Sequence, residues 1–153
     1  MDADRVGPGL AITNRCDQLH FRQEEVVAFF LALAANGPNA LQGELSVVFL
    51  NDSEMADLHE RFLHDPVTTD VITFPGDEKD DFAGEICVSA ERAWIESRDR
   101  EIPFSHEVCL YLAHGWLHLM GLDDHTENDR RDMRRAEEES LIAAEPLPEF
   151  SWR

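Results

Sequence analysis

Apolar and polar residues follow two different periods along the chain, and these periods predict strands and helices. Runs rich in β-branched and aromatic residues predict strands at 10–14, 43–52, 68–76 and in the first half of 83–93. Apolar residues spaced three and four apart predict helices at 23–37, 51–63, 90–100, 103–121 and 126–144. Residues 145–153 follow neither period and are expected to be irregular. This order favours an α+β fold in which one small sheet of about four strands is covered by about five helices.

Residues with known capping preferences mark the ends of the last three helices. Ser89 separates the predicted strand from the helix at 90–100, and Thr126 precedes the helix at 126–144 with acidic residues in its first turn. Pro103 and Gly121 stand at the two ends of the helix between them. These residues therefore predict where the last three helices begin or end.

Length and composition are those of one globular domain spanning residues 1–153. Hydrophobic residues make up 43% of the 153 residues, and no apolar run approaches the roughly 20 residues that cross a bilayer. The first residues lack the basic and apolar regions of a signal peptide, so a cytoplasmic protein without a membrane partner is expected. The odd number of cysteines, Cys16, Cys87 and Cys109, fits buried thiols rather than a disulfide framework.

The formal net charge is −19, from 32 acidic and 13 basic side chains. This balance argues against nucleic-acid binding by a broad basic surface, because Lys and Arg supply most non-specific affinity for phosphates. An RNA substrate would therefore be bound locally or with the help of a partner. The acidic run at 137–139 is expected to be a solvated helix face without function.

One segment, "HGWLHLMGLDDH" at 114–125, concentrates residues that bind metals. His114 and His118 are four residues apart and share one face of the predicted helix, so both imidazoles can reach one ion. Gly121 allows the chain to turn, and Asp124 or His125 can then supply a third ligand. Three protein ligands and one open position describe a catalytic zinc site with a metal-bound water as nucleophile.

The residue after the first histidine constrains the reaction. Zinc peptidases with the H-E-x-x-H motif carry their general base at this place, where this chain has Gly115. A peptidase is therefore not favoured.

Three ordered motifs, "TTDVITFP", "GEICVS" and "HGWLHLMGLDD", resemble those of the YbeY family of metal-dependent endoribonucleases. The resemblance implies a small mixed sheet and one Zn²⁺ per chain held in a cleft. It also implies cleavage of single-stranded RNA in 3′-end maturation of small-subunit ribosomal RNA and in ribosome quality control.

Carried over by position, the family's first two zinc ligands correspond to His114 and His118. The third corresponds to Asp124 if the alignment has no gap, and to His125 if the loop contains one extra residue. Met133 keeps its family distance without a gap, which favours Asp124.

The family's substrate-contacting arginine corresponds here to Leu63. Arg61 and His64 are the nearby candidates for the positive charge or proton that phosphoryl transfer needs. Thr69 and Asp70 are candidates for substrate binding at the cleft. The apolar residues that follow are expected in the core: Val71, Ile72 and Phe74.

Two classes of function fit these observations. One is a zinc-dependent endoribonuclease. The other is a non-catalytic, metal-stabilised ribosome-assembly factor. The expected partners are single-stranded RNA and the small ribosomal subunit, with a basic ribosomal protein as a bridge between this acidic chain and RNA. The open metal position favours the first, whereas the acidity and the missing arginine favour the second.

Overall fold

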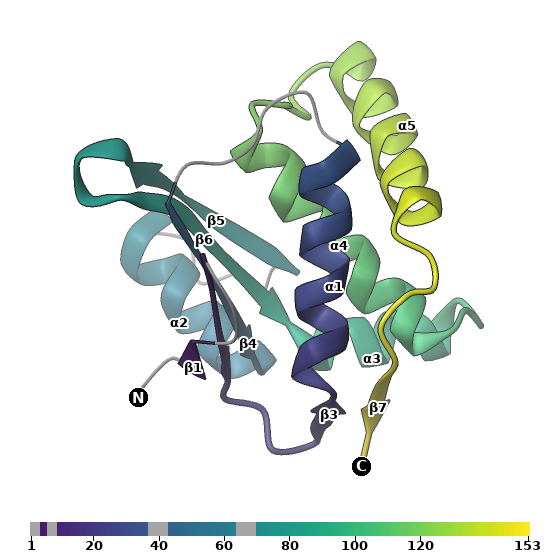
Figure 1. Ribbon diagram of the computed structural model, residues 1–153. Coiled ribbons are helices and arrows are strands. Elements are labelled where there is room, and N and C mark those ends of the chain that lie inside the picture. Colours follow the sequence, from purple (N-terminus) through teal and green to yellow (C-terminus); the bar gives the residue numbers. More distant parts are fainter. Residues whose placement is uncertain (1–3, 6–8, 37–42, 64–69) are drawn as a thin grey trace.

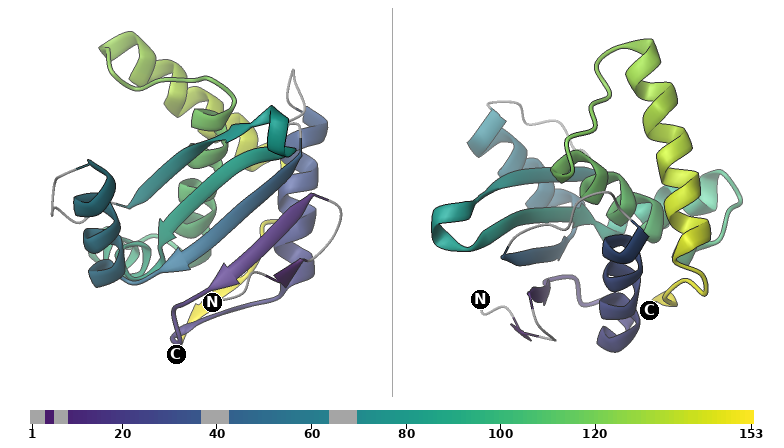
Figure 2. Two further views of the ribbon diagram at one scale, coloured as in Figure 1. Left: turned by 90° about the vertical axis from the view of Figure 1, so that its left-hand side faces the viewer. Right: turned by 45° about the horizontal axis from the view of Figure 1, so that its top comes forward.

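The structure, a computed structural model, describes residues 4–5, 9–36, 43–63 and 70–153, and it has the predicted α+β class (Figure 1). Helices cover both faces of the larger of two sheets: α2 lies against one face, and α1 and α4 lie against the other (Figure 2). None of the helices in these ranges is long and apolar enough to cross a membrane.

The larger sheet has the order β1-β2-β4-β6-β5. Its main strands are β2 (Leu10–Asn14), β4 (Glu44–Leu50), β5 (Val71–Asp77) and β6 (Phe82–Ser89), and the two-residue strand β1 (Asp4–Arg5) is added at one edge. The β2–β4 and β4–β6 pairs are parallel, whereas β5 and β6 pair antiparallel and are joined by the acidic turn η1 (Glu78–Asp80). The sheet is therefore mixed, as the family resemblance implied.

The five predicted helices are present as α1 (Gln23–Asn36), α2 (Asp52–Leu63), α3 (Ala90–Asp99), α4 (Phe104–Leu119) and α5 (Glu127–Ala143). Ser89 caps α3 by accepting a hydrogen bond from the Arg92 N–H. Thr126 and Asp129 form a reciprocal capping box at the start of α5. The capping residues in the sequence therefore set these boundaries correctly.

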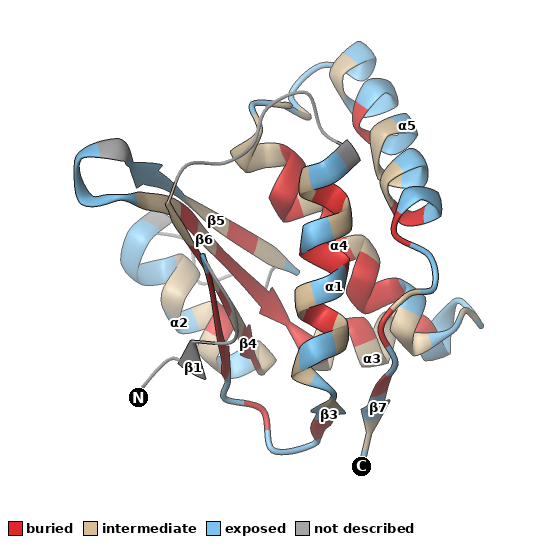
Figure 3. Ribbon diagram, in the orientation of Figure 1, coloured by how far each residue is buried: buried red, intermediate tan, exposed pale blue. Residues whose placement is uncertain are grey.

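Alternate residues of the strands divide the core between the two faces of the sheet. Ile86 and Val88 of β6 belong to the larger cluster, which α1 and α4 cover, and Cys87 belongs to a smaller cluster with Met55 of α2 and Ile72 of β5. Figure 3 shows buried positions along the helices where they meet the sheet and exposed positions on their outer sides. Cys16, Cys87 and Cys109 are buried free thiols, as predicted.

The expectation of an irregular C-terminus is wrong for three residues. Strand β7 (Phe150–Trp152) pairs antiparallel with β3 (Leu19–Phe21) in a second, two-stranded sheet. Phe150 is buried, with its ring centroid 5.4 Å from that of Phe21 and 5.8 Å from that of Phe49. A strand of three residues is too short to show a period, and its partner lies at the other end of the chain.

Helix α4 approaches the sheet closely at Gly115. A Cβ built at this position would lie 2.6 Å from Cγ2 of Ile86 and 3.3 Å from Cγ1 of Val71. Ile86 is fully buried, so its side chain has little room to move away. Glycine at 115 is therefore what allows the helix to lie against β5 and β6.

We expect Gly115→Ala to destabilise the protein. Overpacking costs about 1–3 kcal/mol and the gain in helix propensity returns about 1 kcal/mol, so the net loss is up to about 2 kcal/mol. Urea unfolding measures this loss, and His106→Ala, at an exposed position of the same helix, is the control.

A double-mutant cycle tests the cause. Gly115→Ala should cost less in an Ile86→Ala background, because the crowded Cγ2 atom is then absent. The same change in the free energy of unfolding in both backgrounds would show that close packing at this position is not the constraint.

Candidate metal centre

The last two turns of α4 bring His114 and His118 together. Their Nε2 atoms are 3.0 Å apart, and the two rings meet edge to face with centroids 4.5 Å apart. Both side chains are about a quarter exposed (26% and 23%), so they are anchored in the protein and still reach solvent. The spacing of four residues places them on one face, as the sequence predicted.

The turn after α4 is a glycine-ended Schellman motif. Gly121 has φ +104, its N–H donates to the carbonyl of His118, and the N–H of Leu122 donates to the carbonyl of Leu117. A residue with a Cβ would be strained at this φ. The turn reverses the chain and carries the following loop back toward the two histidines.

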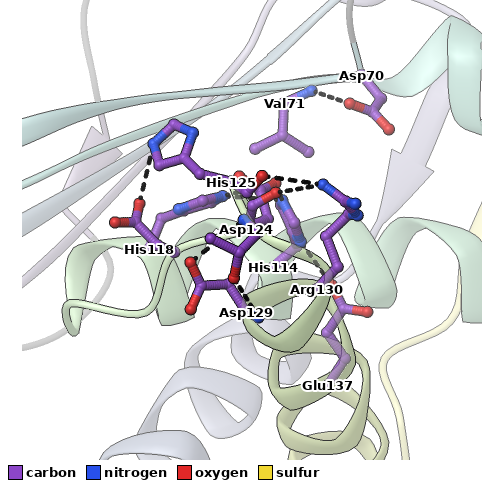
Figure 4. A network of polar contacts seen from close by, with 11 residues as sticks. Asp70, Val71, His114, His118, Asp124, His125, Asp129, Arg130 and Glu137 are labelled. Atoms are coloured by element: carbon purple, nitrogen blue, oxygen red, sulfur yellow. Dashed lines mark hydrogen bonds and ion pairs between the residues drawn. The ribbon is translucent and has the colours of Figure 1, made fainter.

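Asp124 in this loop faces both histidines (Figure 4). Its Oδ2 atom lies 3.6 Å from Nε2 of His114 and 3.5 Å from Nε2 of His118. The loop is held from α5, where the guanidinium of Arg130 donates to the carbonyl oxygens of Asp124 (3.4 Å) and His125 (3.1 Å). The position of Asp124 is therefore supported by a long side chain of the next helix.

His125, the alternative third ligand, lies outside this group. Its side chain is 80% exposed, and its Nε2 atom lies 3.3 Å from Oδ1 of Asp123. His114, His118 and Asp124 are the one set of potential ligands that the described part of the chain brings together, with ligand atoms within 4.8 Å of one another.

The geometry of this metal group, His114, His118 and Asp124, fits a divalent cation. Ligand atoms bonded to a tetrahedral zinc ion at about 2.0–2.1 Å lie about 3.4 Å apart. The three separations of 3.0, 3.5 and 3.6 Å lie on both sides of this value. Two imidazoles and a carboxylate are a common ligand set for zinc, and they leave one coordination position open.

Glu137 of α5 orients His114 from behind the metal group. The Nδ1 atom of His114 lies 2.5 Å from Oε2 of Glu137, whose side chain is only 13% exposed. A hydrogen bond donated by Nδ1 to this carboxylate leaves Nε2 of His114 with its lone pair directed at the metal group. Glu138 and Glu139 are exposed, so the expectation of a solvated run at 137–139 is wrong for its first residue alone.

The carboxylates around His114 favour positive charge at this place. Burial lowers the pKa of His114, but the hydrogen bond and charge of Glu137, together with the charges of Asp124 and Asp70, outweigh it and raise the pKa above its ordinary value. The same electrostatic environment favours a bound cation.

The metal group lines a pocket of about 600 Å³. Across it lie His59 and Phe62 of α2 and the stretch from Asp70 to Pro75 in and before β5. Asp70, predicted to bind substrate, is thus in the lining, and one of its carboxylate oxygens accepts the N–H of Val71. Arg61 is exposed on α2 and does not line the pocket, while His64 and Thr69 lie outside the described residues.

Three residues at this site were not predicted from the sequence: His59, Phe62 and Glu137. Helical spacing could have found them, because Met55, His59 and Phe62 share one face of α2, and Glu137 lies midway between the buried Met133 and Leu141 of α5. Phe74 was expected in the core, but it is half-buried and lines the pocket, as does Val71, whereas Ile72 is buried.

A second cavity, of about 830 Å³, lies between β3, β7 and the start of α1. Its lining includes Arg22 and Arg153 as well as Glu25 and Glu149, and it contains no residue of the metal group. The smaller pocket is the candidate site because it contains the converging ligand atoms of His114, His118 and Asp124.

Comparison with known proteins connects this site to a family. The family model described as Endoribonuclease YbeY matches residues 11–145. The chain belongs to the YbeY family. An Endoribonuclease YbeY from Chlamydia muridarum is 32% identical over 147 residues, covering 90% of this chain and 89% of the relative. One from Acholeplasma laidlawii is 36% identical over 101 residues, covering 65% of this chain and 74% of the relative.

The YbeY resemblance seen in the three sequence motifs is therefore confirmed, and a solved structure supports the fold. The solution structure of a Thermotoga maritima protein superposes with a TM-score of 0.63 over 88% of each chain, at 20% sequence identity. At this identity the likeness concerns the fold alone.

We expect Glu137→Ala to weaken zinc binding about 10- to 100-fold, because His114 loses the partner that fixes its orientation. Glu137→Gln should lose less, since its amide oxygen still accepts the Nδ1–H bond. Competition with a fluorescent zinc chelator measures the affinity.

Glu138→Ala, one residue along α5 and exposed, is the matched control and should bind zinc like the wild type. Equal affinity in Glu137→Ala and Glu138→Ala would contradict an orienting role for Glu137.

Proposed function

We propose that this YbeY family member is a zinc-dependent endoribonuclease that cuts single-stranded RNA. The observation that carries the proposal is the convergence of His114, His118 and Asp124 on one point inside a pocket of about 600 Å³. Membership in a family of endoribonucleases supplies the class of substrate.

The metal ligands in this proposal are His114, His118 and Asp124, with one Zn²⁺ per chain. The ion would supply Lewis-acid activation of water and stabilisation of charge at phosphorus. The oxygen ligand also suits other divalent metals, so zinc is proposed from the two imidazoles. Asp124 is proposed over His125 because its carboxylate already faces both imidazoles.

The remaining side chains of the pocket would position RNA and exchange protons. His59 and Asp70 are the titratable residues of the described lining outside the metal group. Either can accept or donate a proton when the phosphodiester is hydrolysed. Asp70 and Thr69 stay proposed substrate contacts, and Arg61 and His64 stay proposed sources of positive charge for the phosphate.

We place this activity in the cytoplasm, in 3′-end maturation of small-subunit ribosomal RNA and in ribosome quality control. The net charge of −19 supports a role for a partner, because long-range attraction to RNA is unfavourable. A basic protein of the small ribosomal subunit has the complementary charge. It would hold the enzyme against the RNA while the pocket selects the strand.

The charges of the pocket support a second candidate function, a non-catalytic assembly factor whose metal stabilises the loop after α4. Among the described residues that line the pocket there is no Lys or Arg to bind a phosphate. A peptidase has no comparable support: Gly115 faces Ile86 in the core, so this position could not direct a glutamate at the metal.

We expect zinc-loaded wild-type protein to cleave end-labelled single-stranded RNA and His118→Ala to lose at least about 100-fold in rate, because it loses a metal ligand. Gel analysis of the cleavage products measures the rates. His106→Ala, an exposed histidine of the same helix, is purified identically and should match the wild type.

Cleavage by all three proteins at the same rate would identify a contaminating nuclease and reject this evidence for a catalytic metal. Absence of cleavage by the wild type, with zinc bound and ribosome association retained, would favour the assembly factor.

A further inference from the structure

The pocket that contains the metal group has an aromatic wall. Phe62, near the end of α2, and Phe74, in β5, both line it together with His114 and His118. The two phenyl rings meet edge to face, with centroids 5.2 Å apart and an interplanar angle of 71°. This arrangement is a favourable aromatic contact, and it fixes one ring against the other.

The two rings differ in exposure. Phe74 is half-buried and packs against the smaller core cluster, which includes Met55, Ile72 and Cys87. Phe62 is 55% exposed and is one of three exposed large apolar side chains in the described part of the chain, the others being Leu31 and Ile142. Phe62 is the aromatic one of the three, and it alone lies at the pocket. Phe74 thus holds the ring of Phe62 in place, while most of the surface of Phe62 stays exposed to solvent.

The charges of the lining exclude the usual way of binding RNA. Proteins gain most of their non-specific affinity for RNA from Lys and Arg at the phosphates. The described lining contains neither, and its charged side chains outside the imidazoles are Asp70 and Asp124. Among the described lining residues, affinity must then come from the metal group and from uncharged surface, to which the aromatic wall contributes.

We propose that Phe62, supported by Phe74, stacks against an unpaired nucleobase of the RNA whose backbone lies at the metal group. This inference rests on the proposed endoribonuclease function and names the residue that would hold the substrate. Every nucleobase has a π face, so the contact tolerates sequence, and it is independent of the protein's negative charge.

The same contact accounts for a preference for single strands. Bases in an RNA duplex are stacked on their neighbours and cannot turn onto a side chain, whereas bases in loops and ends can. A stacking wall beside the metal group therefore selects unpaired RNA without reading its sequence.

The test uses the zinc-loaded protein and a hydrolysis-resistant single strand, a 2′-O-methyl phosphorothioate oligoribonucleotide that contains 2-aminopurine. Its fluorescence is quenched when the base stacks. We expect Phe62→Leu, which keeps an apolar side chain without a ring, to raise the dissociation constant about 5- to 150-fold and to abolish the quenching. Phe62→Trp should retain both affinity and quenching.

Leu31→Ala, an exposed apolar residue of α1 away from the pocket, is the matched control and should change neither quantity. The dependence of binding on salt should be the same in wild type and Phe62→Leu, because no ionic contact is removed. Thermal unfolding of each variant verifies that it is folded.

Equal affinity and equal quenching in wild type and Phe62→Leu would overturn the stacking proposal, and cleavage of RNA by the zinc-loaded wild type would show that the endoribonuclease function stands without it. If the wild type neither binds nor cleaves RNA, both proposals fail.

Discussion

The close packing of α4 against the sheet is the constraint on which the metal group depends. Gly115 lets the helix approach Ile86 at a distance that no side chain at this position could share. The residues on either side of this contact, His114 and His118, are then held at the rim of the pocket with their Nε2 atoms 3.0 Å apart. The Schellman turn at Gly121 then directs the loop that contains Asp124 back toward the two imidazoles. Gly115 therefore determines how closely α4 lies against the sheet, and Gly121 forms the turn that brings Asp124 to the two histidines.

The electrostatics of the site follow from where the carboxylates lie. The chain carries a net charge of −19, and two of its carboxylates, Glu137 and Asp124, lie next to the ring nitrogens of His114. A divalent cation bound there would be stabilised by these carboxylates, and it would offset the negative charge that otherwise repels phosphate. The aromatic wall of the same pocket adds an uncharged surface. In the proposed function, a bound cation and the Phe62 ring would supply locally the affinity for RNA that a basic surface supplies in other proteins.

Local signals in the sequence were sufficient for most of the fold and for the metal group. Ser89, Gly121 and Thr126 set helix ends through contacts with residues a few positions away, which the sequence displays directly. Residues brought together only by tertiary structure were missed. The pairing of β7 with β3 joins opposite ends of the chain, and Glu137 meets His114 across two helices from within a run of three glutamates. The run at 137–139 was predicted to be solvated, but Glu137 is largely shielded by its contact with His114. The sequence shows which helix face a residue occupies but not which side chains that face contacts.

The most direct test of the metal centre is a crystal structure of zinc-loaded protein with anomalous data collected on both sides of the zinc absorption edge. We predict one strong peak per chain, with the ion about 2.0–2.2 Å from Nε2 of His114, Nε2 of His118 and a carboxylate oxygen of Asp124. We also predict that Nδ1 of His114 keeps its contact with Glu137. A peak coordinated by His125 instead of Asp124, or no peak between the two α4 histidines, would contradict the metal centre described here.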